Sequence, residues 1–204
     1  MNGPNRSQLI LTEIRHSAAV ITFNRPATRN ALSAEMQNYL ERVVDELTDQ
    51  TDIRTLIFTG SDNVFLSGAN IRELTELDHD AALSFSQRGQ LLFQRIAASR
   101  KTTIAAINGF CMGGGLDFAL ACDLRIASPI VEFAHPGARL GIITGWGGTQ
   151  RLPRLIGRTK AIEFFATARR LTARDALKLG LIHVVAPSPV EYALKVGSPP
   201  IPTF

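Results

Sequence analysis

The chain has 204 residues, of which 45% are hydrophobic and 20% are charged, and its formal net charge is +4. This composition is typical of one globular domain, and the length is enough to bury a core without disulfides or a structural metal. The two cysteines, Cys111 and Cys122, form no CxxC or Cys/His pattern, so we expect free thiols and no metal site.

The ends and the charge pattern exclude several classes of protein. The opening MNGPNRSQ lacks a basic segment followed by an apolar run, and no apolar stretch reaches the ~18 residues of a membrane span. We therefore expect a cytoplasmic protein that does not enter a membrane. The basic residues between 151 and 178 have helical spacing with few aromatics between them, which favours a solvated surface over a nucleic-acid interface.

Strands and helices alternate in the first half of the chain. Apolar residues from Leu32 to Leu47 recur at helical spacing behind Ser33, which is placed as an N-cap. Around this helix we expect, in order, a strand at 18–23, a strand at 54–60, a loop at 61–70, an amphipathic helix at 80–99 and a strand at 102–110.

The second half continues the alternation. Thr172 and Asp175 match a capping box, and Gly180 stands where that helix would end. We also expect strands at 123–128, 131–136 and 181–187 and a helix at 147–157. This order predicts an α/β domain with mainly parallel pairing. Its boundaries are 9–186, between a flexible N-terminus at 1–8 and a loosely ordered, proline-rich tail at 187–204.

A glycine cluster lies in INGFCMGGGLDFALACDLRIA, residues 107–127, where a strand leads through glycines into a helix. Such a junction presents backbone N–H groups to negative charge, and glycine lets the chain approach a ligand closely. The motifs GxxxxGK[ST], GxGxxG and GxSxG do not fit. Taken alone, the cluster is explained equally well by a packing turn.

Five segments in one order change this interpretation: NRPATRNAL (24–32), FLSGANI (65–71), INGFCMGGGLDFALACDLRIAS (107–128), LGIITGWGGTQRLPRLIG (140–157) and TARDALKLGLIHVV (172–185). Together they closely resemble the enoyl-CoA hydratase/isomerase (crotonase) family. The resemblance implies a ββα spiral core, with the usual C-terminal helical region shortened or absent here. It also implies homotrimers or dimers of trimers, and an acyl-CoA thioester as ligand, with coenzyme A part of the substrate and no separate cofactor.

The resemblance also implies roles for particular residues. The backbone N–H groups of Ala69 and Gly114 would form an oxyanion hole for a thioester enolate, and Arg25, Arg29 and Arg72 are candidates for the coenzyme A phosphates. Ala31, Gly68, Asn70, Ile71, Gly137 and Trp146 complete the expected substrate-binding residues. The family most often has aspartate at the position of Asn70, and we expect this difference to have a minor effect.

The chain departs from the hydratases at both catalytic glutamates. The first position is Asp117, which keeps a carboxylate but is shorter, and the second is Gly137, which has no group to carry a proton. Losing one positioned acid or base costs about 10²–10⁴ in rate, so a fast two-carboxylate hydratase is not expected. Alternatively, the carboxylate of Asp117 could only interact favourably with the positive end of the helix dipole and have no catalytic role. His135 is a candidate substitute acid or base, Thr144 could orient a water, and Trp146 is expected to line an apolar acyl pocket.

Several functions therefore remain open. Hydratase is the family's commonest activity, whereas isomerisation or a decarboxylase-like reaction needs only one carboxylate, Asp117. A non-catalytic acyl-CoA-binding protein would also explain the missing glutamate. Peptidase chemistry, known on a similar fold in ClpP-type serine peptidases, is disfavoured because GFCMGG contains no serine and Cys111 has no evident histidine partner.

Overall fold

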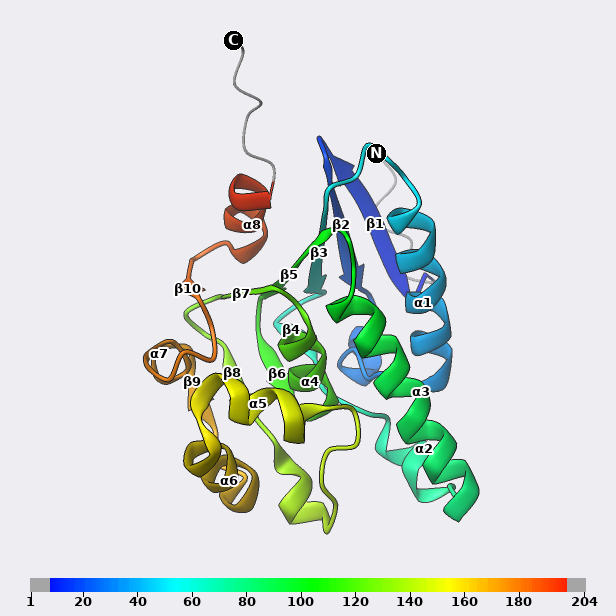
Figure 1. Ribbon diagram of the computed structural model, residues 1–204, viewed down its shortest axis with the longest axis vertical. Coiled ribbons are helices and arrows are strands. Elements are labelled where there is room, and N and C mark those ends of the chain that lie inside the picture. Colours follow the sequence, from blue (N-terminus) through cyan, green and yellow to red (C-terminus); the bar gives the residue numbers. More distant parts are fainter. Residues whose placement is uncertain (1–7, 198–204) are drawn as a thin grey trace.

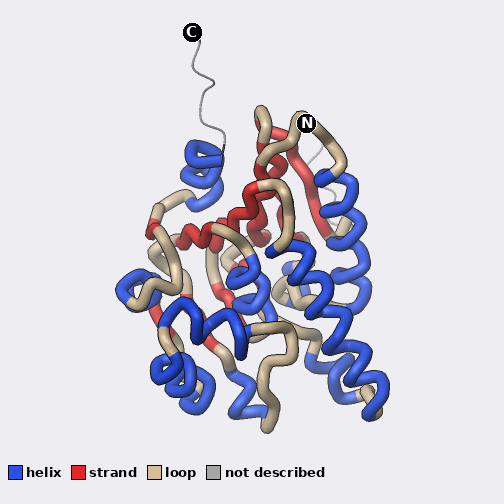
Figure 2. The backbone as a smooth tube through the Cα atoms, in the orientation of Figure 1, coloured by secondary structure: helices blue, strands red, loops and turns tan. Residues whose placement is uncertain are grey.

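The computed structural model describes residues 8–197. The predicted flexible N-terminus therefore lies outside the described residues except for Gln8, which is exposed. The described chain forms two sheets surrounded by helices (Figures 1 and 2).

The larger sheet has six strands in the order β1-β2-β3-β5-β7-β10. Its strands are β1 (Ile10–Arg15), β2 (Ala18–Phe23), β3 (Thr55–Gly60), β5 (Thr102–Ile107), β7 (Leu124–Ala127) and β10 (Val184–Val185). Only β1 and β2 pair antiparallel in this sheet; the other neighbours are parallel. The predicted α/β class with mainly parallel pairing is confirmed.

The smaller sheet has four strands in the order β4-β6-β8-β9. They are β4 (Val64–Leu66), β6 (Phe110–Met112), β8 (Glu132–Ala134) and β9 (Leu171–Thr172). From β3 to β8 the chain alternates between the two sheets, so each turn of the spiral adds one strand to each sheet before its helices. The prediction of a continuous loop at 61–70 is wrong at β4, because its pairing partner, β6, lies more than 40 residues further along the chain.

Helices connect and cover the strands. They are η1 (Pro26–Thr28), α1 (Ala34–Thr48), α2 (Ile71–Thr75), α3 (His79–Ala97), α4 (Gly114–Ala121), η2 (Pro136–Leu140), α5 (Gly148–Ile156), α6 (Arg158–Thr167), α7 (Ala173–Lys178) and α8 (Pro189–Gly197). The predicted caps are present: Ser33 Oγ accepts from the Met36 N–H at 3.1 Å, and Thr172 Oγ1 accepts from the Asp175 N–H at 3.2 Å.

Alternate residues of the central strands face two separate apolar layers. In β2, Ile21 and Phe23 face the main core between the two sheets and α1, α3 and α4, whereas Ala18 and Val20 face the opposite layer. A strand buried on both faces needs apolar residues at every position, which accounts for the continuous apolar runs in the sequence.

Helix α8 covers that second layer, on the side of the sheet away from α1 and α3 (Figure 1). Ala193 is fully buried there, and Thr55 Oγ1 of β3 donates to Gly197 O at 2.7 Å. The prediction of a loosely ordered tail is therefore wrong for 189–197, because the sheet face offers the apolar surface of the helix a partner. Residues 198–204 lie outside the described residues.

Phe118 joins α4 to β2 and β3 of the larger sheet and to α3. Its ring makes edge-to-face contacts with Phe23, Phe58 and Phe93, with centroids 5.0–5.5 Å apart, and it is fully buried. Edge-to-face aromatic pairs contribute about 0.5–1.5 kcal/mol beyond area burial. The orientation of α4, and of the glycines before it, depends on this cluster.

We predict that Phe118→Ala lowers the free energy of unfolding by about 3–5 kcal/mol, because it removes a buried ring and leaves a cavity. Chemical denaturation followed by circular dichroism measures the change. Phe110→Ala is the matched control, since that ring is 41% exposed, and it should cost much less. Equal losses in the two variants would show that the aromatic cluster does not hold α4.

Candidate active site

Two loops distant in sequence lie side by side beyond the strands. The Leu32 N–H donates to Gly68 O at 2.8 Å, and the Ser67 N–H donates to Arg29 O at 3.2 Å. An isolated parallel bridge pairs Leu32 with Ala69. The segments NRPATRNAL and FLSGANI are therefore joined by backbone hydrogen bonds and lie next to each other.

The second of these loops packs against the glycine cluster. A Cβ built on Gly68, whose φ is +105°, would lie 3.0 Å from Met112 O and 3.2 Å from Gly114 N. A Cβ built on Gly114 would lie 3.5 Å from Ala69 N. A side chain at Gly68 would meet crowding and positive-φ strain together, so glycine is needed there. The backbone amides of Ala69 and Gly114 are thereby brought together.

Gly114 is also the first residue of α4. The N–H groups of a first helical turn have no partner within the helix and carry the positive end of its dipole. In the described part of the chain, neither the Ala69 nor the Gly114 amide donates to a backbone carbonyl in a turn, loop or cap. The two amides thus form a pair suited to an oxygen that gains negative charge.

Asp117 lies one helical turn after Gly114 and is fully buried. One carboxylate oxygen, Oδ1, is 3.0 Å from His135 Nε2, and the other, Oδ2, accepts a hydrogen bond from Thr144 Oγ1. Gly148, which follows on α5, has no room for a side chain because a Cβ there would collide with Oδ1. Three elements therefore converge on this one carboxylate.

Three titratable groups near this carboxylate, His135, Arg151 and Cys111, have different environments. His135 is itself buried and packs edge-to-face on Phe165 with centroids 5.0 Å apart. Burial lowers the pKa of Arg151, while the negative charge of Asp117 acts to raise it. Burial and the same negative charge raise the pKa of the Cys111 thiol, so this cysteine is unsuited to act as a nucleophile.

Gly137 is buried in η2, two residues after His135. A Cβ built on it would lie 2.5 Å from Ile142 O, and the Ile142 N–H donates back to Gly137 O at 3.0 Å. The backbone at Ile142 therefore fills the space that a side chain at position 137 would need. A longer residue would therefore require the segment from 137 to 142 to move.

Trp146 is 4% exposed and packs on Phe85 and Phe93, with ring centroids 5.0 and 5.6 Å away. Its indole also lies against Gly114 and Gly89, where any Cβ would collide with it. It borders a hollow of ≈410 Å³ that Thr144 and Arg151 also line, whereas Ala69, Gly114 and Asp117 do not. Trp146 thus covers one side of Gly114 and lines one side of this hollow.

The three arginines predicted to bind phosphate lie on the outside of the paired loops. Arg25 and Arg29 are exposed on either side of η1, and the guanidinium of Arg25 is 3.2 Å from Glu35. Arg72 is exposed on α2. Ala31 and Ile71 belong to the same two loops; Ile71 is 55% exposed.

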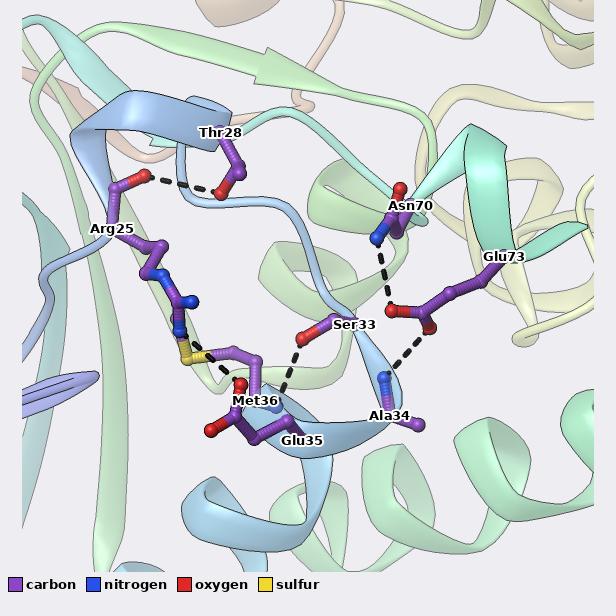
Figure 3. A network of polar contacts seen from close by, with 8 residues as sticks. All are labelled: Arg25, Thr28, Ser33, Ala34, Glu35, Met36, Asn70 and Glu73. Carbon is purple, nitrogen blue, oxygen red and sulfur yellow. Dashed lines mark hydrogen bonds and ion pairs between the residues drawn. The ribbon is translucent and has the colours of Figure 1, made fainter.

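Two residues that organise these loops were not among the sequence-based candidates. Asn30 is buried at positive φ, donates to Val64 O at 2.9 Å and accepts from the Arg25 N–H at 2.8 Å. Glu73 accepts from Asn70 Nδ2 and from the Ala34 N–H, both at 2.9 Å (Figure 3). The asparagine inside an arginine-rich loop was a signal for Asn30. Glu73 follows Asn70, the N-cap of α2, at the spacing of a capping box, whereas its bond to the Ala34 N–H depends on the fold.

Within residues 8–197, no group of three or more His, Cys, Asp or Glu side chains is placed to hold a metal ion. The helices of that part of the chain are each too short or too polar to cross a bilayer.

Comparison with known proteins agrees with the fold. The family model for enoyl-CoA hydratase/isomerase matches residues 13–196. YngF of Bacillus subtilis, named for enoyl-CoA hydratase/isomerase, is 45% identical over 181 residues, which are 88% of this chain and 70% of YngF. The short-chain-enoyl-CoA hydratase of Clostridium acetobutylicum is 38% identical over 88% of this chain and 69% of its own length. The crystal structure of an enoyl-CoA hydratase from Bacillus anthracis aligns with a TM-score of 0.89 at 31% identity, covering 93% of this chain and 75% of that one.

The chain therefore belongs to the enoyl-CoA hydratase/isomerase family, and its fold is the crotonase fold.

We predict that Gly137→Glu, which restores the carboxylate of the family pattern, does not give a faster enzyme. The new side chain would collide with Ile142 O, and such overpacking costs about 1–3 kcal/mol of stability. Thermal unfolding and the initial rate with crotonyl-CoA measure the two effects. Ala138→Glu, at an exposed neighbouring position, is the control for added charge. A stable and faster Gly137→Glu enzyme would contradict this account of the loop.

Proposed function

We propose that this protein is an acyl-CoA-processing enzyme of the enoyl-CoA hydratase/isomerase type that stabilises a thioester enolate between the Ala69 and Gly114 amides. The observation that carries the proposal is the approach of the two backbones, with Gly68 packed on the glycine cluster and Gly114 beside Ala69. Coenzyme A is part of the substrate in this proposal, and no separate cofactor takes part.

The chemistry explains why two backbone amides are needed. Removing a proton from the α-carbon of an acyl thioester, or adding water across its 2,3 double bond, moves negative charge onto the thioester oxygen. Two fixed N–H donors stabilise that charge in the transition state, and removing one such donor elsewhere costs about 10²–10³ in kcat. Because the donors belong to the main chain, side-chain identity at Ala69 does not decide them.

We infer that Asp117 is the group that carries the proton. It lies three residues after Gly114, about one turn along α4 from the Gly114 amide. His135 and Thr144 hold its two oxygens in place, and Gly148 leaves them room. His135 and Thr144 are positioning residues in this scheme, because each contacts one oxygen of the Asp117 carboxylate.

The absence of a carboxylate at Gly137 favours isomerase over hydratase. In isomerisation, one base takes a proton from C2 of a 3-enoyl thioester and returns it to C4, so that the double bond moves into conjugation and no atom is gained or lost. Hydration also needs a second group to activate water. Asp117 alone can serve the first reaction more readily than the second.

We predict that the protein converts a 3-enoyl-CoA into the conjugated 2-enoyl-CoA, and that Asp117→Asn lowers kcat by about 10²–10⁴ because the amide cannot take up the proton. The rise of enone absorbance gives the rate, and mass spectrometry shows that no water is added. Asp123→Asn, a carboxylate just after α4 that bonds Thr103, is the control.

Other outcomes of the same assay point elsewhere. Loss of the crotonyl-CoA enone with gain of one water would establish a hydratase and refute the preference for isomerisation. Binding of both thioesters without turnover, unaffected by Asp117→Asn, would establish a non-catalytic acyl-CoA-binding protein.

The homotrimer, or dimer of trimers, stays a prediction. Leu140, Ile142 and Ile143 lie within four consecutive residues and are 49–68% exposed, which supports a contact surface in this region. We expect sedimentation equilibrium to give a mass three or six times that of the chain, and Ile143→Asp to lower it. A monomeric wild-type protein would contradict the prediction.

A further inference from the structure

Glu73 connects the loop that carries Ala69 to a helix that begins 39 residues earlier in the chain. One of its carboxylate oxygens, Oε1, accepts from Asn70 Nδ2 at 2.9 Å, and the other, Oε2, accepts from the Ala34 N–H at 2.9 Å (Figure 3). Asn70 directly follows Ala69, and Ala34 is the first residue of α1. We propose that Glu73 is a positioning residue that fixes the Ala69 amide by fastening Asn70 to the start of α1.

The α1 end of this bridge is a firm anchor. The Ala34 N–H belongs to the first turn of a 15-residue helix and has no partner inside it. A carboxylate there makes a charge-assisted hydrogen bond and also meets the positive end of the helix dipole. Ser33 Oγ accepts from the Met36 N–H, so the two side chains satisfy different donors of the same turn.

The Asn70 end of the bridge depends on the polarity of the amide. Asn70 Oδ1 accepts from the Arg72 N–H at 3.2 Å, while its NH₂ group donates to Glu73. An aspartate at this position, the residue most common in the family, would keep the first bond, but it would place a second carboxylate against Glu73. The bond from Asn70 to Glu73 therefore predicts a larger effect of this difference than the sequence alone did. Asn70 and Glu73 are therefore a matched donor and acceptor, and an exchange of their roles should also match.

The remaining contacts limit what the loss of the bridge can do. The Leu32 N–H still donates to Gly68 O, and the Ser67 N–H to Arg29 O, on the other side of Ala69. Without Glu73 these two bonds would still hold the loop in place, but the orientation of the Ala69 amide would no longer be fixed. The Ala69 donor is used most strongly when the oxygen is fully charged, so the loss should appear in kcat rather than in KM. This catalytic consequence rests on the proposed function; the fastening of the loop does not.

The test compares Glu73→Gln, Asn70→Asp and the double variant that carries both. Each single variant removes one bond of the bridge, and we expect kcat with the best enoyl-CoA to fall about 10-fold while KM changes less than about threefold. In the double variant the new amide at position 73 donates to the new carboxylate at position 70, and its carbonyl accepts from the Ala34 N–H. We therefore expect the double variant to regain most of the lost kcat, which independent losses cannot produce.

A second measurement does not depend on activity. The amide of Leu32 is buried and bonded to Gly68, so its hydrogen exchange reports how firmly the loop is held. We expect the hydrogen-exchange rate at Leu32 to increase in both single variants and to return to the wild-type rate in the double variant. Glu76→Gln is the control, because Glu76 is exposed at the end of α2 and its side chain has no hydrogen bond or ion pair with the described residues.

The outcomes separate the two proposals. Exchange in Glu73→Gln equal to that in Glu76→Gln, or a double variant as impaired as the sum of the singles, would overturn the role of Glu73. Exchange that follows the expected pattern in a protein without turnover of any enoyl-CoA would establish the fastening and refute the proposed function.

Discussion

The close approach of two backbone segments, the loop at Gly68 and the turn into α4, is the constraint on which the rest of the site depends. A Cβ at Gly68 would crowd Met112 O and Gly114 N, and a Cβ at Gly114 would collide with Trp146. The approach becomes possible because β4 and β6 pair in the smaller sheet and deliver the two loops to the same edge. The spiral of two sheets therefore brings the backbone amides of Ala69 and Gly114 close together.

The site is built in layers around that contact. The aromatic cluster of Phe118 sets the position of α4 from inside, and Trp146 closes the outer side of Gly114. Asp117 precedes Phe118 in α4, and both of its oxygens have partners while Gly148 leaves room for them. A buried carboxylate without such partners would be costly, so the surrounding His135 and Thr144 account for its presence in the core.

Much of this could be predicted from the sequence, and the limits have physical causes. Apolar runs, the Ser33 and Thr172 caps and the alternation of elements predicted the α/β class, since each depends on neighbours within a few residues. The strand β4 and the helix α8 were missed, because three residues of a strand and a proline-flanked segment are stabilised only by distant partners. The contact of His135 with Asp117 belongs to the same group, as 18 residues separate the two side chains.

The sequence by itself determined the family and the chemical inventory: the glycines at the two loops, one carboxylate at Asp117 and none at Gly137. These are properties of residue type and order, and folding does not change them. Only the tertiary structure decided how the inventory is used. It closed position 137 against any side chain, surrounded Asp117 with His135 and Thr144, and joined Glu73 to both Asn70 and α1. Apart from the Asn70–Glu73 bond, which lies within the first turn of α2, these contacts depend on the packing of elements far apart in the chain.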